Sequence, residues 1–390
     1  MATGPTSVLA RPERALLAGV EIKGKRPLWP LSDSLDELAQ LARTAGAQVV
    51  GAITQRLERP THTYLGKGKL EELQARLDSF DTLILDDELT PDQQRNLERA
   101  LGERAKVIDR TALILDIFSQ RARTREGRLQ VELAQHQYLL PRLAGQWSHL
   151  ERLGGGIGTR GPGETQIETD RRLLRRKVQR RKAELEEVRR HRALYRTRRR
   201  DQEVPVVALV GYTNAGKSTL FNALTAADVL VAPQLFSTLD PTTRRLRLPS
   251  GLDVLLTDTV GFIHKLPPMV VAAFRATLEE LGEADVLLHV VDVTHRNAEE
   301  QVRVVESILE GLGLAGKPVL NVLNKLDLLP EGADGPAPGE AAFAAPAAHL
   351  EGIRVSAFRR LGLVALLARL EEALAAALQA PPAAASVRED

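Results

Sequence analysis

The stretch "VPVVALVGYTNAGKSTLFNAL", residues 204–224, decides the fold of the largest part of this chain. An apolar run, a glycine-bounded loop and a helical pattern follow one another in it. Gly211, Gly216, Lys217 and Ser218 satisfy the phosphate-loop pattern in the strand, loop and helix context that it requires. Backbone N–H groups and the helix N-terminus of such a loop surround a β-phosphate. We therefore expect Lys217 to bridge the β- and γ-phosphates and the Ser218 hydroxyl to bind Mg²⁺.

Near-continuous apolar runs recur through residues 202–378, and they are "VPVVALV", "LDVLLTD", "ADVLLHVVDV", "KPVLNVLN" and "IRVSA". Helical segments separate them, which is typical of buried parallel strands with helices on both faces of the sheet. The sequence thus predicts an α/β nucleotide-binding domain over 202–378. The Ala/Pro/Gly-rich stretch before "IRVSA" reads as a surface loop, and 379–390 as a disordered tail.

The run "LLTDTVGF" ends a strand with Asp258 and Gly261. Asp258 is suited to hold Mg²⁺ through a water molecule, and the Gly261 N–H to sense the γ-phosphate, so that this segment moves on hydrolysis. A threonine in "QLFSTLDPTTRRLRL", residues 234–248, is expected to complete the Mg²⁺ coordination. Thr238, Thr242 and Thr243 all qualify chemically, and spacing alone does not choose among them.

Another strand ends in "LNVLNKLD", with Asn324, Lys325 and Asp327. The Asp327 carboxylate can accept hydrogen bonds from both N1–H and the 2-amino group of guanine, whereas adenine offers a lone pair at N1 and no 2-amino group. Asn324 suits the other base edge, the Lys325 stem can cover the ring, and a backbone N–H at Ser356 or Ala357 can reach guanine O6. These elements, in order and each at a strand end, predict GTP as the nucleotide.

Residues 1–125 alternate strands, "ALLAGVEI", "AQVVGAI", "DTLILDD" and "AKVIDR", with helical patterns. This alternation predicts a small parallel α/β domain. Ser34 with Glu37 reads as a capping box, and Thr90 as a cap with Pro91 in the first helical position. The segment "YLGKGKLEEL" lacks the Gly-Lys-Ser/Thr ending of a phosphate loop, so we interpret it as a strand-to-helix turn.

Residues 126–201 predict an antiparallel pair of helices, an arm with a glycine-rich tip. The first helix is expected to be about 33 Å long and to carry a heptad seam, with a kink at Pro141. A capping box of Thr165 and Glu168 would start the second helix. Two arginines occupy seam positions in this second helix. The seam residues are Leu129, Leu133, His136, Leu140, Leu143, Trp147 and Leu150, then Leu174, Val178, Arg181, Leu185, Val188, Arg192 and Tyr195.

Charge is concentrated in the second helix of this arm. Residues 171–200 hold 15 Lys/Arg and 3 Asp/Glu, a net charge of +12, whereas the other 360 residues hold 38 basic and 48 acidic residues, a net charge of −10. A solvated helix face is the plain alternative, but so dense a charge repels itself without an anionic partner.

The tip, "RLGGGIGTRGPGETQ" from Arg152, joins two helices and follows no strand, so we expect it to bind RNA and not nucleotide. Its glycines let the backbone approach RNA, and Arg160 can contact phosphate or stack on a base. The alternative is that the glycines only close the hairpin. The candidate RNA-binding residues are Gly154, Gly155, Gly156, Gly158, Arg160, Gly161 and Gly163.

The composition excludes several classes of protein. The chain has no cysteine, so disulfides, thiolate metal sites and thiol catalysis are absent. No apolar stretch approaches the length of a membrane span, and the first twenty residues lack the regions of a signal peptide. We expect a cytoplasmic protein, most simply a monomer.

Together these motifs resemble the HflX GTPases, which are ribosome-associated. The likeness covers nearly the whole chain, through "YLGKGKLEEL", "RLQVELAQHQY", "GGGIGTRGPGETQIETDRR", "GYTNAGKSTLFNAL", "FSTLDPTTR", "DTVGFIHKLP" and "NKLD". The resemblance implies that Thr238 is the sensor of Mg²⁺ and γ-phosphate. It also implies that the amino-terminal domain and arm bind the large ribosomal subunit and its rRNA, and that the protein splits stalled or idle ribosomes, notably under heat stress.

The chain also departs from the pattern of the family. After Gly362 one helix and a tail follow, so the small carboxy-terminal domain of some members has no expected counterpart. Phe262 stands where Ras-type enzymes have a water-orienting glutamine, which predicts slow intrinsic hydrolysis until an activator, in the family the ribosome, supplies that group. Asn214 resembles the residue that binds K⁺ in potassium-activated GTPases; the alternative is that it bonds the loop backbone.

In the expected GTP site, the catalytic residues are Lys217, Thr238 and Gly261, and the Mg²⁺ ligands are Ser218 and Thr238. The whole site comprises Gly211, Tyr212, Thr213, Asn214, Ala215, Gly216, Lys217, Ser218, Phe236, Ser237, Thr238, Leu239, Asp240, Asp258, Thr259, Val260, Gly261, Asn324, Lys325, Asp327, Ser356 and Ala357.

Two other functions stay open at this level. One is an enzyme that remodels or modifies RNA and uses nucleotide as a timer; the basic arm suits it, but no second catalytic constellation is visible. The other is a signalling switch whose arm binds an acidic protein or a membrane surface. Against this function, the basic segment has few bulky apolar residues on its exposed faces, and the sequence has no lipidation motif.

Overall fold

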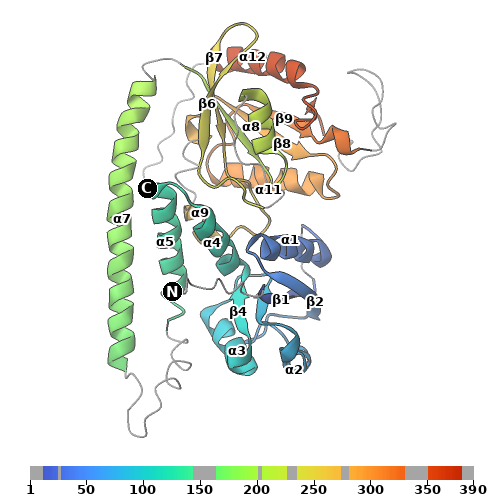
Figure 1. Cartoon of the computed structure of the whole chain (residues 1–390), viewed down its shortest axis with the longest axis vertical. Coiled ribbons are helices and arrows are strands. Elements are labelled where there is room, and N and C mark those ends of the chain that lie inside the picture. The colour runs from blue at the N-terminus through green and yellow to red at the C-terminus, as the bar shows by residue number, and fades with distance from the viewer. Residues whose placement is uncertain are drawn as a thin grey trace, which may run out of the picture. The chain divides into compact units, whose positions relative to one another are not determined.

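The computed structural model describes residues 12–24, 28–143, 164–200, 204–225, 235–273, 281–329 and 350–379. The chain divides into two compact units, the first formed by 1–117 with 134–179 and the second by 118–133 with 180–390. Each unit is built around its own sheet (Figure 1).

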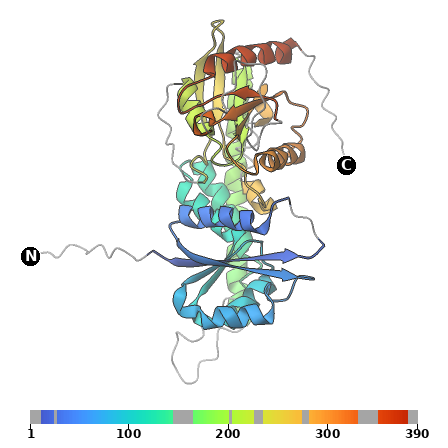
Figure 2. The same cartoon turned by 90° about the vertical axis from the view of Figure 1, so that its right-hand side faces the viewer.

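The first unit contains a four-stranded parallel sheet of order β2-β1-β3-β4, as the sequence predicts. Helix α1 lies on one side of this sheet and α2 and α3 lie on the other (Figure 2). The apolar strand residues that face α2 and α3, among them Leu16, Leu83 and Leu85, are fully buried. The elements are β1 (Arg14–Ile22), α1 (Leu31–Thr44), β2 (Gln48–Leu57), α2 (Lys67–Ala75), η1 (Leu77–Ser79), β3 (Thr82–Leu85), α3 (Pro91–Leu101), η2 (Gly102–Arg104) and β4 (Lys106–Asp109).

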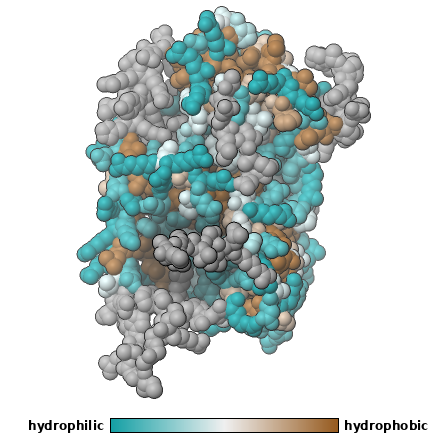
Figure 3. Space-filling view, in the orientation of Figure 1, coloured by the Kyte–Doolittle hydropathy of each residue, from teal (hydrophilic) through white to brown (hydrophobic). Residues whose placement is uncertain are grey.

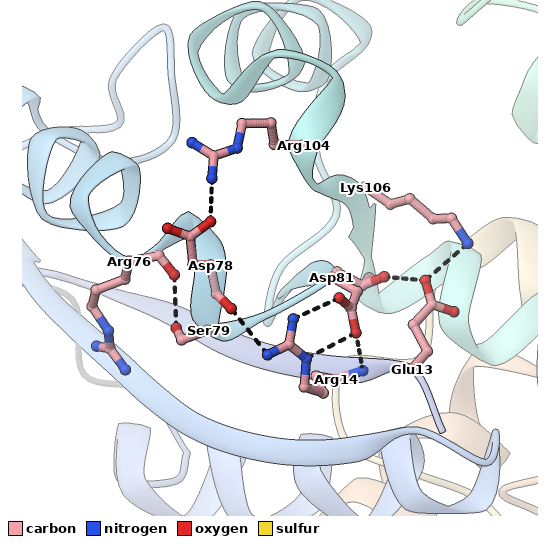
Figure 4. A network of polar contacts seen from close by, with 9 residues as sticks. Glu13, Arg14, Arg76, Asp78, Ser79, Asp81, Arg104 and Lys106 are labelled. Atoms are coloured by element: carbon pink, nitrogen blue, oxygen red, sulfur yellow. Dashed lines mark hydrogen bonds and ion pairs between the residues drawn. The ribbon is translucent and has the colours of Figure 1, made fainter. Parts of the chain in front are cut away.

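Ionic contacts tie the amino-terminal ends of these strands together (Figure 4). The Arg14 guanidinium, at the start of β1, donates two hydrogen bonds to the Asp81 carboxylate, at 2.8 and 3.1 Å, and a third, at 3.0 Å, to the carbonyl oxygen of Asp78. Lys106, at the start of β4, pairs with Glu13 at 2.8 Å. Because these groups are partly exposed, each contact contributes little to stability.

Two predicted helix caps have different outcomes. Helix α3 is capped as expected: the Gln93 N–H donates to Thr90 Oγ1 at 3.2 Å, Gln93 Oε1 accepts from the Thr90 N–H at 3.1 Å, and Pro91 is the first helical residue. The capping box at Ser34 and Glu37 is wrong. Helix α1 begins earlier, at Leu31 after Pro30, so both residues lie inside the helix and are buried.

Ser34 and Glu37 serve a buried ion network instead. Arg110, at the start of α4 (Arg110–Arg121), is 1% exposed and donates to Glu37 Oε1 at 2.6 Å, to Asp86 Oδ1 at 2.5 Å and to the Asp86 carbonyl oxygen at 3.0 Å. Ser34 Oγ donates to the other oxygen of Asp86 at 2.8 Å. Burial opposes the charge on Arg110, but Asp86 and Glu37 outweigh it and raise its pKa. The network therefore fixes α1 and α4 to the carboxyl end of β3.

The second unit contains a six-stranded sheet of order β10-β9-β8-β5-β7-β6. All pairs are parallel except β6 with β7, so the predicted parallel α/β fold is confirmed. The polar edge strand β6 was not predicted, because its sequence "TTRRLR" has no apolar run. The elements are β5 (Val206–Gly211), α8 (Lys217–Thr225), β6 (Thr242–Arg247), β7 (Asp253–Asp258), α9 (Pro268–Ala273), β8 (Val286–Asp292), α11 (Ala298–Gly311), β9 (Val319–Asn324), η3 (Leu326–Leu328), β10 (Ile353–Arg354) and α12 (Leu363–Gln379).

Helices α5 (Arg125–Leu139) and α7 (Glu164–Arg200) form the helical region. Arg181 on α7 pairs with Glu132 on α5 at 2.8 Å, so the two helices are neighbours there, and the predicted seam residues Val178 and Leu185 are buried. The expected 33 Å length of the first helix is wrong. Helix α5 ends at Leu139, ahead of Pro141, because proline cannot continue a helical hydrogen-bond ladder.

Other predictions for this region concern its ends. Helix α7 begins at Glu164, two residues earlier than a cap at Thr165 would allow. The side chains of Thr165, Glu168, Arg192 and Tyr195, and the seam residues Trp147 and Leu150, lie outside the described residues, and so does the glycine-rich tip with Arg160.

Within the described residues, none of the helices combines the length and the apolar character that a membrane crossing requires. In the face that Figure 3 shows, hydrophilic residues predominate and apolar residues occur in scattered groups.

We expect Arg110→Met to lower the free energy of unfolding of the first unit by about 3–5 kcal/mol, because Asp86 and Glu37 would be left buried without their cation. Urea unfolding followed by fluorescence of the buried Trp29, in a Trp147→Phe background, measures this loss. Arg104→Met removes only an exposed pair with Asp78 and should cost less than about 1 kcal/mol. Equal losses in the two variants would contradict the structural role of Arg110.

Candidate nucleotide site

The phosphate loop connects β5 to α8. Two positions of this loop need glycine, because atoms of neighbouring segments lie where a Cβ would stand. Gly211 has φ +144°, and a Cβ there would lie 2.3 Å from the Val290 carbonyl oxygen. Gly216 has φ +97°, and a Cβ there would lie 2.3 Å from Asn324 Nδ2. No other residue type fits these positions without a shift of the neighbouring strand ends.

A hollow open to solvent lies over this loop and over two segments distant in sequence. Residues of the loop form one side, residues 236–238 a second, and Thr259 with Gly261 a third. Its lining residues are Thr213, Asn214, Gly216, Lys217, Ser218, Thr219, Phe236, Ser237, Thr238, Thr259 and Gly261. All were predicted except Thr219, which follows the motif directly in the sequence.

Lys217 is buried in this hollow and its ammonium group donates to the carbonyl oxygens of Gly211, at 3.1 Å, and Tyr212, at 2.9 Å. Burial lowers the pKa of Lys217 to about 8, since the nearby Asp258 compensates only in part. A phosphate anion beside this ammonium would favour its charged form.

Three oxygen-bearing side chains meet beside Lys217. The Ser218 hydroxyl lies 2.6 Å from Asp258 Oδ2 and 2.8 Å from Thr238 Oγ1, and Thr238 Oγ1 donates to the same carboxylate oxygen at 3.0 Å. Asp258 Oδ1 is buried without a hydrogen-bond partner in the described part of the chain, and burial raises the pKa of this carboxyl group. Two hydroxyls and a carboxylate with an unused oxygen are the donors that Mg²⁺ prefers, so the residues fit this ion.

The structure distinguishes the three candidate threonines. Thr238 reaches the cluster, whereas Thr242 and Thr243 belong to β6 and pair with Asp258 and Thr257 in the ladder. The Thr243 hydroxyl bonds the Thr257 hydroxyl at 2.9 Å. Only Thr238 is therefore placed to share a cation with Ser218.

The segment after Asp258 pairs with the phosphate loop. The Thr213 N–H donates to the Phe262 carbonyl oxygen at 2.7 Å, and the Phe262 N–H donates to the Gly211 carbonyl oxygen at 3.1 Å. A Cβ at Gly261 would lie 2.6 Å from Thr213 Cα and 2.9 Å from Lys217 Nζ. The ring of Phe262 is buried, and it offers no group to orient a water molecule.

At the end of the site where the base is expected, Asn324 has a structural role that was not predicted. Its Nδ2 donates to the Ala215 carbonyl oxygen at 2.9 Å, and its Oδ1 accepts from the Ala357 N–H at 3.0 Å. The side chain is buried, and these two bonds brace the two loops. They use one N–H of the amide, so the predicted contact of Asn324 with a base edge stays a prediction.

The other base-reading candidates lie on either side of Asn324. Asp327 is partly exposed, and its Oδ1 accepts a hydrogen bond from the Ser356 hydroxyl. Lys325 adopts φ +72° and its ammonium group pairs with Asp292 at 2.6 Å. Asp292 was not among the predicted residues, although it ends the apolar run of β8, where the sequence places a polar residue at a strand end.

Several predicted residues support the site from outside the hollow. Ala215 and Val260 are buried beside it, and Leu239 is also buried. The Tyr212 hydroxyl accepts from the His264 N–H at 2.6 Å. The Asp240 carboxylate is not among the groups that line the hollow; it accepts hydrogen bonds from the backbone N–H groups of Arg123 and Thr124 and from the Thr124 hydroxyl, so its part in nucleotide binding stays a prediction.

Family models match three consecutive parts of the chain. Residues 32–119 match the "GTP-binding GTPase N-terminal" family, 121–199 the "GTP-binding GTPase Middle Region" family and 206–325 the "50S ribosome-binding GTPase" family.

Curated relatives extend over most of the chain. GTPase HflX of Caldanaerobacter subterraneus subsp. tengcongensis is 52% identical over 88% of this chain and 77% of its own length. GTPase HflX of Alkalihalophilus pseudofirmus is 49% identical over 93% and 83%, and that of Escherichia coli is 48% identical over 76% and 70%. Among solved structures, a GTP-binding protein of Sulfolobus solfataricus in complex with GDP has 24% identity and a TM-score of 0.45, over 93% of this chain and 99% of that chain.

We expect Asp327→Asn to weaken GTP binding by about 10–150-fold, or roughly 1.5–3 kcal/mol, because the amide loses the double acceptor for guanine. Binding of xanthosine triphosphate should rise, since its 2-carbonyl accepts from the amide. Equilibrium binding of both nucleotides measures the change. Asp253→Asn, which alters a carboxylate of the exposed β6–β7 edge, is the matched control, and an unchanged base preference in Asp327→Asn would refute the assignment.

Proposed function

This chain belongs to the HflX family of GTPases, and we propose that it hydrolyses GTP with Mg²⁺ in order to bind the large ribosomal subunit and separate stalled or idle ribosomes. The match of residues 206–325 to the 50S ribosome-binding GTPase family carries this proposal. In this proposal the protein acts as a cytoplasmic monomer whose arm, residues 126–201, is a part distinct from the amino-terminal domain and the GTP-binding domain.

The exposed charge of α7 supports an RNA partner. Among the side chains that the structure describes between residues 171 and 190, the exposed basic ones are Arg172, Arg175, Arg176, Lys177, Arg180, Lys182 and Arg190. Glu184 pairs with both Arg180 and Arg181, but residues 171–200 hold only 3 acidic residues against 15 basic ones, so most of the positive charge is not offset. Phosphate contacts by such residues release counterions, and binding through them should weaken steeply as salt rises.

In the proposed hydrolysis, water attacks the γ-phosphorus and the bond from that phosphorus to the β,γ-bridging oxygen breaks, which yields GDP and phosphate. Lys217 offsets charge that develops on the phosphates. Ser218 and Thr238 would hold Mg²⁺ directly and Asp258 through a water molecule, and the bound ion would supply further positive charge. The Gly261 N–H would sense the γ-phosphate.

The buried ring of Phe262 leaves the attacking water without a side chain to orient it from this position. We therefore propose that intrinsic turnover is slow and that the ribosome supplies the missing group. A protein that remodels RNA, or a signalling GTPase, would not need the ribosome for this step. Co-sedimentation with ribosomes in sucrose gradients, with and without a GTP analogue, separates the three functions.

Asn214 supports the proposal that K⁺ assists hydrolysis. The residue adopts φ +62° and is exposed at the hollow, and its side chain makes no hydrogen bond within the described part of the chain, which leaves its amide oxygen available to a cation. A cation bound there would lie where an arginine finger offsets charge in other GTPases.

Turnover should accordingly be about tenfold or more higher in potassium than in sodium at matched ionic strength. Steady-state phosphate release measures the ratio. Asn214→Ala should abolish the difference between the two cations. Equal turnover of the wild-type protein in both salts would rule out the cation site.

Replacing residues 154–163 with a short Gly-Ser turn should leave GTP affinity intact and reduce ribosome binding and ribosome-stimulated hydrolysis together. This is expected because the proposed rRNA contacts lie in the tip and the nucleotide contacts do not. Replacing residues 331–340, a segment of the same length in the Ala/Pro-rich stretch, is the matched control and should change neither property.

Two results of the tip replacement would contradict the proposal. Normal ribosome binding and response would mean that the tip is only a connector. Loss of GTP affinity would mean that the two glycine loops have been assigned the wrong way round.

A further inference from the structure

The Asp240 carboxylate, two residues beyond Thr238, accepts hydrogen bonds from the residues that precede α5. Its Oδ2 accepts hydrogen bonds from the backbone N–H groups of Arg123, at 2.7 Å, and Thr124, at 2.9 Å, and its Oδ1 accepts from the Thr124 hydroxyl at 2.5 Å. Thr124 Oγ1 also accepts from the Gly127 N–H at 3.0 Å, which caps the first turn of α5. All of these residues belong to the second unit.

Phe236, two residues before Thr238, contacts the end of α4. Its ring packs edge-on against the ring of Phe118, with centroids 4.8 Å apart and an interplanar angle of 85°. Both rings are fully buried, a geometry that stabilises an aromatic pair beyond the burial of its area. Phe118, like Phe236, belongs to the second unit.

The segment from Phe236 to Asp240 is thus held at both ends by one stretch of chain, residues 118–127, which we call the elbow. Thr238 lies between the two attachments, and its hydroxyl bonds Ser218 and Asp258. One short segment therefore faces the cation cluster on one side and the elbow on the other.

We propose that Asp240 and Phe118 are positioning residues that hold Thr238 in place for Mg²⁺ and the γ-phosphate. Because coupling between two sites is reciprocal, the nucleotide must equally change how firmly the start of α5 is held. Loss of the γ-phosphate releases Thr238 and loosens the elbow. The coupling rests on the GTPase activity of the chain and needs no ribosome, so its failure and the failure of the proposed ribosomal function are distinguishable.

Gly127 provides a selective way to break the attachment. A Cβ at this position would lie 2.4 Å from Asp240 Oδ1 and 3.1 Å from Thr124 Oγ1, so Gly127→Ala should push the carboxylate away while its charge stays. Alanine otherwise favours a helix. Gly68→Ala, also in a helix but with open space around the added Cβ, is the matched control.

The first test compares the affinities of the full chain for a non-hydrolysable GTP analogue with Mg²⁺ and for GDP. Asp240→Ala and Gly127→Ala should lower the affinity for the analogue by about 5–30-fold and that for GDP by less than about twofold. Thr124→Val should act in the same direction, Thr124→Ser should restore the wild-type ratio because it keeps the hydroxyl, and Gly68→Ala should leave both affinities unchanged.

The second test follows hydrogen exchange of the amides of Arg123, Thr124 and Gly127. In the wild-type chain they should exchange more slowly with the GTP analogue than with GDP, and Asp240→Ala should abolish that difference. Equal exchange in the two nucleotide states, or equal loss of both affinities in the first test, would overturn the proposal. If Asp240→Ala fails to fold, the Thr124→Val and Thr124→Ser pair decides between the same outcomes.

Discussion

The Asn324 amide holds the nucleotide site together, because it joins two loops that are more than a hundred residues apart. It donates to the carbonyl oxygen of Ala215 in the phosphate loop and accepts from the N–H of Ala357 in the loop beyond β10. The side chain is 2% exposed, so water does not compete for either bond. Gly216 packs against this amide so closely that no side chain fits. The phosphate-binding end and the base-reading end of the site thus share one buried support.

The rest of the site depends on a segment with two faces. Thr238 meets Ser218 and Asp258 on the cation side, while Phe236 and Asp240 contact the elbow on the other. In the proposed coupling, a change at the γ-phosphate would act on the start of α5 through residues 236–240. Such coupling needs only a segment with two arrangements, one held by nucleotide and one released.

Arginine has different roles in the amino-terminal domain and on α7. Arg110 is buried with two carboxylates and fixes helices to the sheet. Removing one partner would leave an unpaired buried charge, which costs about 3–5 kcal/mol. Arg172 and Arg176 on α7 are exposed, and the few acidic groups of that helix cannot neutralise its charge. The first arrangement stabilises the fold, and the second is the one that the proposed anionic partner would contact.

The sequence by itself determined the two parallel α/β folds and the phosphate loop, since buried parallel strands need continuous apolar runs and a phosphate needs glycine-bounded N–H groups. Apolar periodicity carries no information on polar edge strands, so β6 was missed, and Thr242 and Thr243 could not be separated from Thr238 until the ladder with β7 enclosed them. The true partners of Ser34, Glu37, Asn324 and Asp240 were likewise decided only by the tertiary structure. A short polar side chain bonds whatever the fold brings within about 3 Å of it, and that neighbour lies far away in the sequence.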